Sequence, residues 1–176
     1  YGVEKDEKKA IEWYKKSAEQ DFATAQYELG ACYLSGLGVE EDEKQALYWV
    51  QKAAEQDYAD AQVLLGNFYS EGIGVEKDAS KAFEWFKKAA EQGNAEGQFF
   101  LGRSYFEGSG IEEDPQKAME WLEKATEQGN TDAQNKLGEC YIEVGVETRK
   151  AFELFQKAAE NGSREAQRNL GKCYMK

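Results

Sequence analysis

Apolar and small side chains recur along the chain at the spacing of one face of an α-helix. Over residues 6–20 the recurring positions lie at i, i+3, i+4 and i+7, which predicts an amphipathic helix. They are Ala10, Trp13, Tyr14 and Ser17. A second stretch, residues 23–35, predicts another helix of the same kind. Its face consists of Gln26, Leu29, Gly30 and Tyr33. Nothing in the chain alternates as a strand does, so the pattern predicts an all-α protein.

This pair of helical stretches returns every 36 residues, with a final step of 33 residues. One marker series is a Gly that follows Leu in each second stretch. It comprises Gly30, Gly66, Gly102, Gly138 and Gly171. Another series is an Ala three residues before Trp, with Leu154 in place of the last Trp. It comprises Ala10, Ala46, Ala82, Ala118 and Ala151. Five copies of one helix pair therefore cover nearly the whole chain.

The predicted helix ends carry residues suited to capping. An Asp stands before the first helix of four copies, where its side chain accepts a hydrogen bond from a free backbone N–H group. These residues are Asp6, Asp42, Asp78 and Asp114. Gly93, Gly129 and Gly162 follow that helix in later copies, whereas the first two copies have Asp21 and Asp57. Glycine suits the left-handed conformation that commonly ends a helix.

Neither helix can bury its apolar face alone, so neighbouring copies must stack. A glycine in mid-helix costs about 1 kcal/mol relative to alanine, and we expect each Leu-Gly position to mark a close helix contact. We expect the Trp series to lie in the core. The predicted fold is a right-handed α-solenoid of about ten antiparallel helices, with residues 1–176 forming a single array. Gly2-Val3 matches Gly38-Val39 in a later loop, so we expect a segment of a longer protein.

The recurring motif resembles the Sel1-like repeat, a relative of the tetratricopeptide repeat. The third copy shows it nearly whole over residues 81–111, including Lys-Ala-x-x-Trp at Lys81–Trp85 and Gln-x-x-Leu-Gly at Gln98–Gly102. It departs from the pattern at Gly97, where the other copies have Ala. The resemblance covers all five copies. It implies an α-solenoid that acts as an adaptor or scaffold in protein binding, without an enzymatic activity.

A cysteine-rich branch of this family has disulfides within each repeat, and β-lactam binding or hydrolysis has been described for some of its members. Cys32, Cys140 and Cys173 occupy one shared position in three copies, and no copy has a second Cys for pairing. We expect partly buried free thiols, which mildly favour a reducing, cytoplasmic compartment, although the sequence leaves localisation open. A β-lactam-active enzyme remains an alternative function.

Composition narrows the classes of partner. The chain carries 22 Lys and Arg against 34 Asp and Glu, a net charge of −12. Such a surface repels phosphate backbones and anionic lipid headgroups, so neither nucleic acid nor membrane is expected as a partner. No apolar stretch approaches the roughly 18 residues of a membrane span.

The chain has no His, which is the most common general base and metal ligand. Neither Ser-x-x-Lys nor a phosphate-binding glycine motif occurs, and three isolated cysteines cannot form a four-ligand zinc site. We therefore expect no catalytic residue, no cofactor and no metal.

Side chains that differ between copies are candidates for partner binding, because stacking explains the shared ones. On the second helix of each copy, the positions of residues 24, 28, 31 and 35 point away from the packing face. In tetratricopeptide-like solenoids this face lines the concave groove. Here and one residue earlier, the first copies carry aromatic and aliphatic side chains. The predicted peptide-binding residues are Tyr27, Glu28, Val63, Leu64, Asn67, Phe99, Phe100, Arg103, Phe106 and Lys136.

Two interpretations of these residues remain open. In the first, copies 1–3 bind a protein or peptide segment through apolar anchors, with surrounding carboxylates that favour Lys or Arg in its flanks. In the second, the curved stack itself buries Leu64 and Phe100. A self-assembling array is a further alternative, and we expect a monomer or a weak homo-oligomer.

Overall fold

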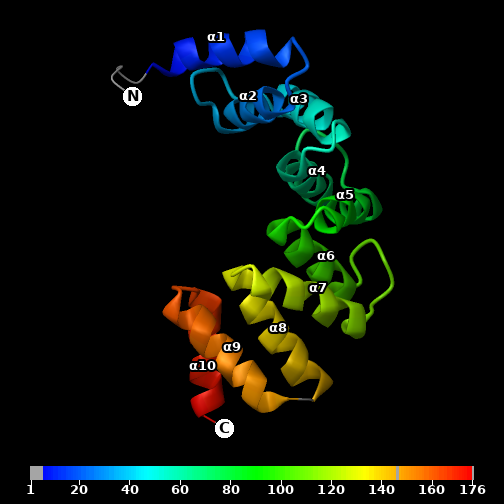
Figure 1. The fold of residues 1–176 in the computed structure, drawn as a ribbon, viewed down its shortest axis with the longest axis vertical. Helices are drawn as coiled ribbons and strands as arrows, with labels where there is room; N and C mark the ends of the chain where they lie inside the picture. Colours follow the sequence, from blue (N-terminus) through cyan, green and yellow to red (C-terminus); the bar gives the residue numbers. More distant parts are fainter. Residues whose placement is uncertain (1–5, 146, 176) are drawn as a thin grey trace. The chain divides into compact units, whose positions relative to one another are not determined.

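The computed structural model describes residues 6–145 and 147–175. These residues form ten α-helices and no strand (Figure 1), which confirms the all-α repeat fold. The chain divides into two compact units, Tyr1–Ala89 and Ala90–Lys176. The prediction of one continuous array and the handedness of its superhelix stay predictions. Gly2 and Val3, which suggested a longer protein, lie outside the described residues.

Unit 1 contains helices that pack against their neighbours in chain order. They are α1 (Glu7–Ala18), α2 (Ala23–Ser35), α3 (Glu43–Glu55), α4 (Ala59–Glu71) and most of α5 (Ala79–Glu91). The contacts of α2 with both α1 and α3 are within this unit. Two cores form here, one under α1 and α2 and one centred on Val50, Leu65 and Phe68. Each repeat therefore completes its core with side chains of the next.

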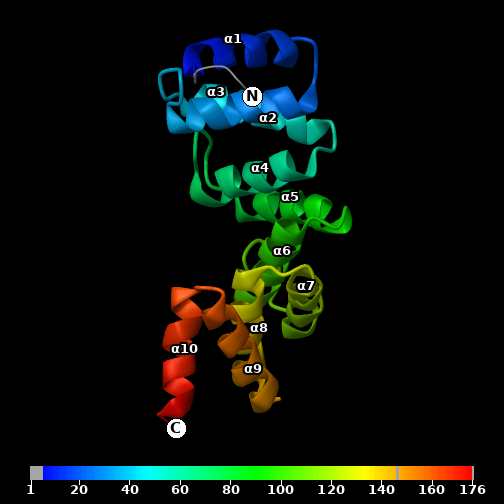
Figure 2. The same cartoon turned by 60° about the vertical axis from the view of Figure 1, so that its left-hand side comes forward.

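Unit 2 repeats this arrangement (Figure 2). Its helices are α6 (Ala95–Glu107), α7 (Pro115–Glu127), α8 (Thr131–Val144), α9 (Thr148–Glu160) and α10 (Arg164–Tyr174). Consecutive helices pack against each other, and α6 also contacts α8. The core is centred on Leu122, Leu137 and Phe155. None of the described helices is long and apolar enough to cross a membrane.

The predicted helix caps are confirmed. Asp6, Asp78 and Asp114 each accept a hydrogen bond at 3.0 Å from the backbone N–H three residues later, and Asp42 accepts two. Left-handed backbone follows the first helix of each copy. It occurs at Asp21, Asp57, Gly93, Gly129 and Gly162. Each chain reversal therefore has the same local geometry, although two of them use Asp.

The mid-helix glycines of the first four copies mark close helix contacts, as predicted, whereas the prediction is wrong for Gly171, where a Cβ atom would meet nothing within 4 Å. A Cβ atom on Gly30 would lie 2.6 Å from Val50 Cγ2, and one on Gly102 would lie 2.7 Å from Leu122 Cγ. Gly138 faces the ring of Phe155 in the same way. Real Cβ atoms do not approach other atoms this closely, so any larger residue at these positions would force the facing side chain or the helix that carries it to move.

The expectation that the Trp series lies in the core is wrong. Trp13 is 66% exposed, and Trp49, Trp85 and Trp121 are half-buried with a Lys three residues later over each ring. The residue after Trp is the deeply buried one in the next four copies. It is Val50, Phe86, Leu122 and Phe155. Successive residues point about 100° apart on a helix, so the Trp position lies at the edge of the predicted face and the position after it, which belongs to the same face, faces the core.

Candidate functional site

Two of the predicted groove residues belong to the core. Val63 is 3% exposed and Phe99 is 9% exposed, and Phe99 packs with Leu122 and Leu137. Both stand one residue before the face that was predicted to line the groove. Stacking of the repeats accounts for their burial, so neither presents much surface to a partner.

In unit 1 the remaining predicted residues are half-buried on α2 and α4. Tyr27 packs edge-on against Tyr58, with ring centroids 5.4 Å apart, and Leu64 lies against the same core. Glu28, next to Tyr27 on α2, and Asn67, one turn after Leu64 on α4, are half-buried polar side chains. The group therefore combines partly accessible apolar area with a carboxylate and an amide.

In unit 2 Phe100 and Arg103 of α6 lie together. The Arg103 guanidinium carbon is 4.8 Å from the centroid of the Phe100 ring, a cation–π geometry. Phe99 lies beneath, with its ring centroid 5.1 Å from that of Phe100. Arg103 Nε is 3.8 Å from Glu107 Oε2. Phe100 is half-buried and packs partly against the core, which leaves part of its ring exposed.

Lys136 of α8 extends this group towards the next repeat. Its Nζ atom is 5.5 Å from the centroid of the Phe106 ring and 3.5 Å from Glu107 Oε1. It also forms an ion pair of 3.0 Å with Glu139 Oε2. Burial lowers the pKa of Lys136, but its hydrogen bond and charge interaction with Glu139 outweigh burial and raise that pKa overall. We call Phe100, Arg103, Phe106 and Lys136 the α6–α8 cluster.

Sequence reasoning missed a polar network beside this cluster. Asn169 of α10 donates from Nδ2 to Asn135 Oδ1 at 3.0 Å and to Glu139 Oε1 at 2.9 Å. Asn135 Nδ2 also donates to Glu139 Oε1, at 3.2 Å. Both Asn side chains are buried. The only signal in the sequence was the loss of apolar residues at these positions in the last two copies.

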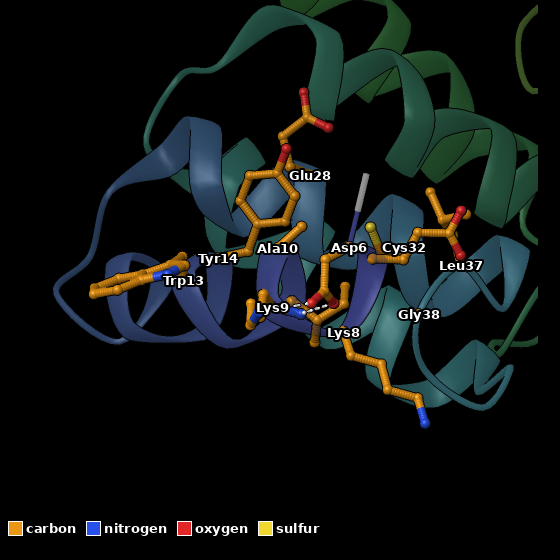
Figure 3. A pocket seen from close by; sticks show the side chains of 12 residues that line it. Asp6, Lys8, Lys9, Ala10, Trp13, Tyr14, Glu28, Cys32, Leu37 and Gly38 are labelled. Atoms are coloured by element: carbon orange, nitrogen blue, oxygen red, sulfur yellow. Dashed lines mark hydrogen bonds and ion pairs between the residues drawn. The ribbon is translucent and has the colours of Figure 1, made fainter. Parts of the chain in front are cut away.

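A pocket of about 1160 Å³ lies against α1 in unit 1 (Figure 3). Its lining includes Tyr14, Glu28, Cys32 and Leu37. Burial first, and then the Glu28 and Glu7 charges, raise the pKa of Cys32, and burial followed by Glu28 does the same for Tyr14. Both groups are thus protonated at neutral pH. The pocket offers an aromatic and acidic lining rather than a nucleophile.

Comparison with known proteins identifies the family. The Sel1 repeat model matches residues 1–22, 23–58, 59–94, 95–130, 131–163 and 164–176. The chain belongs to the Sel1 repeat family. Sel1 repeats commonly mediate protein–protein interactions. No curated protein matches the chain.

Solved structures agree with this assignment. A Sel1 repeat protein from Oxalobacter formigenes is 36% identical, with a TM-score of 0.91 over 98% of this chain and 70% of that one. The protective antigen c5321 of uropathogenic Escherichia coli is 38% identical, with a TM-score of 0.93 over 97% of this chain and 37% of that one. Helicobacter pylori cysteine rich protein B is 31% identical, with a TM-score of 0.56 over 74% of this chain and 94% of that one.

The cysteines of this Sel1 repeat chain are free thiols: Cys32 and Cys140 are buried, and Cys173 is half-buried. Burial raises the pKa of Cys140 to about 12, so this thiol is protonated and unreactive at neutral pH. Among the described residues there is also no group of His, Cys, Asp or Glu side chains that could hold a metal ion.

Proposed function

We propose that this Sel1 repeat chain is a non-enzymatic adaptor that binds a protein or peptide segment through the α6–α8 cluster. The observation that supports the proposal is the position of Phe100. Its ring is half-buried on the face of α6 that points away from the Leu101–Gly102 packing face, and Arg103 lies over it. An aromatic ring with an adjacent guanidinium group is typical of residues that dominate binding energy at protein interfaces.

A partner would gain both apolar and polar contacts here. Complete burial of an aromatic anchor is worth about 1.5–3 kcal/mol, and Phe100 retains part of that surface. Arg103 and Lys136 are hydrogen-bond donors that carry a positive charge, while Glu96, Glu107 and Asp132 surround them with negative charge. We therefore expect a segment with an apolar side chain at its centre and Lys or Arg in its flanks.

The decisive experiment combines affinity capture with direct titration. The wild-type chain serves as bait in a lysate of the native organism, and mass spectrometry identifies the captured protein. Titration of that protein against Phe100→Glu should then show at least about a tenfold loss of affinity, because a charge replaces the apolar anchor and each tenfold loss corresponds to about 1.4 kcal/mol.

Gln116→Glu is the matched control, because it adds the same charge at an exposed position of α7 in the same unit. It should bind as the wild type does. A large loss of thermal stability in Phe100→Glu, with unchanged affinity of the folded fraction, would contradict the proposal and assign Phe100 to the core.

Two simpler measurements check the alternatives. Turnover of nitrocefin by the purified chain would overturn the non-enzymatic assignment. Light scattering over a concentration series distinguishes self-association from capture of another protein, because only self-association raises the molar mass of the isolated chain.

A further inference from the structure

A buried glutamine joins consecutive repeats near the end of each helix pair. In unit 2, Gln98 Nε2 donates to the Ala90 carbonyl at 3.5 Å. Gln98 Oε1 accepts a hydrogen bond of 2.8 Å from Nε2 of Gln128, at the end of α7, and Gln128 Nε2 also donates to the Gly93 carbonyl at 3.0 Å. We call this junction, where α6 packs against α7, seam 3/4.

The same pair occurs in unit 1. Gln26 Nε2 donates to the Ala18 carbonyl at 3.1 Å, and Gln26 Oε1 accepts from Gln56 Nε2 at 2.7 Å. The repetition shows that the glutamine amide at the end of the next repeat's first helix, Gln56 after α3 or Gln128 after α7, is a recurring part of the junction. It supplies the donor that a fully buried glutamine oxygen needs.

The junction where α8 packs against α9, seam 4/5, lacks this pair. Gln134 occupies the position of Gln98 and is fully buried. Within residues 6–145 and 147–175, neither Gln134 Nε2 nor Gln134 Oε1 has a hydrogen-bond partner, and the same holds for Thr126 Oγ1. Three buried polar atoms at the α7–α8 turn are thus unsatisfied.

Two differences in sequence account for this. Asn161 stands where the other copies have Gln, and its side chain is one methylene shorter. It makes no hydrogen bond with Gln134. Thr126 stands eight residues before Gln134, where the corresponding residue before Gln26 and Gln98 is Ala. The hydroxyl therefore adds a polar atom at the place where the donor is missing.

We propose that seam 4/5 holds an ordered internal water molecule in place of the glutamine amide. An unsatisfied buried polar group destabilises the fold, and buried waters typically make two to four hydrogen bonds to such groups. The water donates to Gln134 Oε1 and accepts from both Gln134 Nε2 and the Thr126 hydroxyl. Its oxygen and hydrogens thus match the three unsatisfied atoms.

A crystal structure that shows ordered solvent tests the proposal directly. The wild type should have a water within hydrogen-bond distance of both Gln134 and Thr126. In Asn161→Gln the longer amide should displace that water and bind Gln134, as Gln128 binds Gln98. The direct bond should raise the Tm by about 2–4 °C, the shift that a gain of about 1 kcal/mol produces in a chain of this size.

Gln128→Asn is the reciprocal control, because it shortens the same side chain in seam 3/4. It should admit a water beside Gln98 and lower the Tm by a similar amount. A wild-type structure in which Gln134 is well ordered and no water contacts it would overturn the proposal. An Asn161→Gln structure in which a water still contacts Gln134 and residue 161 does not would also overturn it.

Discussion

Seam 3/4 and seam 4/5 join consecutive repeats of one unit with the same apolar contact and with different polar contacts. In both seams a glycine in mid-helix, Gly102 or Gly138, admits a large side chain of the following repeat. Of these two seams, only seam 3/4 has a hydrogen bond between two glutamine side chains, which joins Gln128 at the end of α7 to Gln98. The apolar contact therefore defines the repeat, and the polar contact varies without loss of the fold.

The two seams also differ on the face that carries the candidate binding site. Seam 3/4 is bridged there by the ion pair between Lys136 and Glu107, whereas seam 4/5 is bridged by the hydrogen bonds of Asn169 with Asn135 and Glu139. Apolar anchors occur beside the ion pair and are absent from the Asn bridge. The proposed binding region and the Asn bridge thus lie next to each other in sequence.

Replacing the mid-helix glycine of each seam by alanine should produce the largest difference in stability between the seams. Gly102→Ala should lower the free energy of unfolding by about 1–3 kcal/mol, because the new methyl group meets Leu122 and, at 3.1 Å, the Ala118 carbonyl. Gly138→Ala should cost less, because the three atoms nearest to the new methyl group all belong to the Phe155 ring, which can tilt. Chemical denaturation measures both.

Gly171→Ala is the control for these two variants. No atom of the described residues lies within 4 Å of a Cβ atom built there, apart from its own helix and chain neighbours. It should stabilise the chain by up to about 1 kcal/mol through helix propensity alone. Equal stability of Gly102→Ala and the wild type would show that the close contact is unnecessary.

Glu139→Gln should weaken the Asn bridge in a pH-dependent way. Burial raises the pKa of Glu139, but hydrogen bonds from Lys136, Asn169 and Asn135 outweigh burial and hold it below the ordinary value of 4.5. The ionised form therefore stabilises the fold above pH 4.5, and this stabilisation is lost as the pH falls through the lowered pKa.

At pH 7 the variant should lose about 1.5–3 kcal/mol of unfolding free energy, the scale of hydrogen bonds to a charged group. The difference from the wild type should shrink on acidification below pH 4.5. Urea titrations at several pH values measure it, and a constant difference from pH 7 to pH 3 would rule out the ionised carboxylate as the stabilising form.

Replacing the amide side chain at the end of α7 or α9 by alanine should give a smaller difference in stability between the two seams. Gln128→Ala leaves Gln98 Oε1 without its donor and should cost about 1 kcal/mol. Asn161→Ala should change stability by less than about 0.5 kcal/mol, because Asn161 makes no hydrogen bond with Gln134. Thermal denaturation of the two variants side by side checks the contrast, and equal losses would contradict it.

The smallest expected effect is a difference in thiol labelling at seam 4/5. Cys140 is fully buried and has a pKa of about 12, whereas Cys173 on α10 is half-buried. A thiol reagent at neutral pH should therefore label Cys173 first, and Cys140 only after unfolding, because the thiolate is the reactive form. Mass spectrometry of single-Cys variants measures the two rates, and fast labelling of native Cys140 would show that the seam opens readily.

Local features of this protein could be read from the sequence because they depend on neighbouring residues. Asp6, Asp42, Asp78 and Asp114 cap their helices as predicted, and the range of α2 agrees with the prediction. Gly30 and Gly102 mark close contacts as predicted, because a Cβ atom at either position would meet the next helix, whereas Gly171 of the same series has no such contact. A periodic pattern reports such constraints directly.

Tertiary structure decided what depends on the exact direction of a side chain. A shift of one residue turns a helical position by about 100°, and this separates buried Leu122 from half-buried Trp121 and buried Phe99 from Phe100. Likewise, only the packed structure shows that the buried side chain of Gln134 has no hydrogen-bond partner where Asn161 replaces the usual Gln. The sequence determines which elements form and repeat, whereas the depth and reach of each side chain follow from the packing of the next helix.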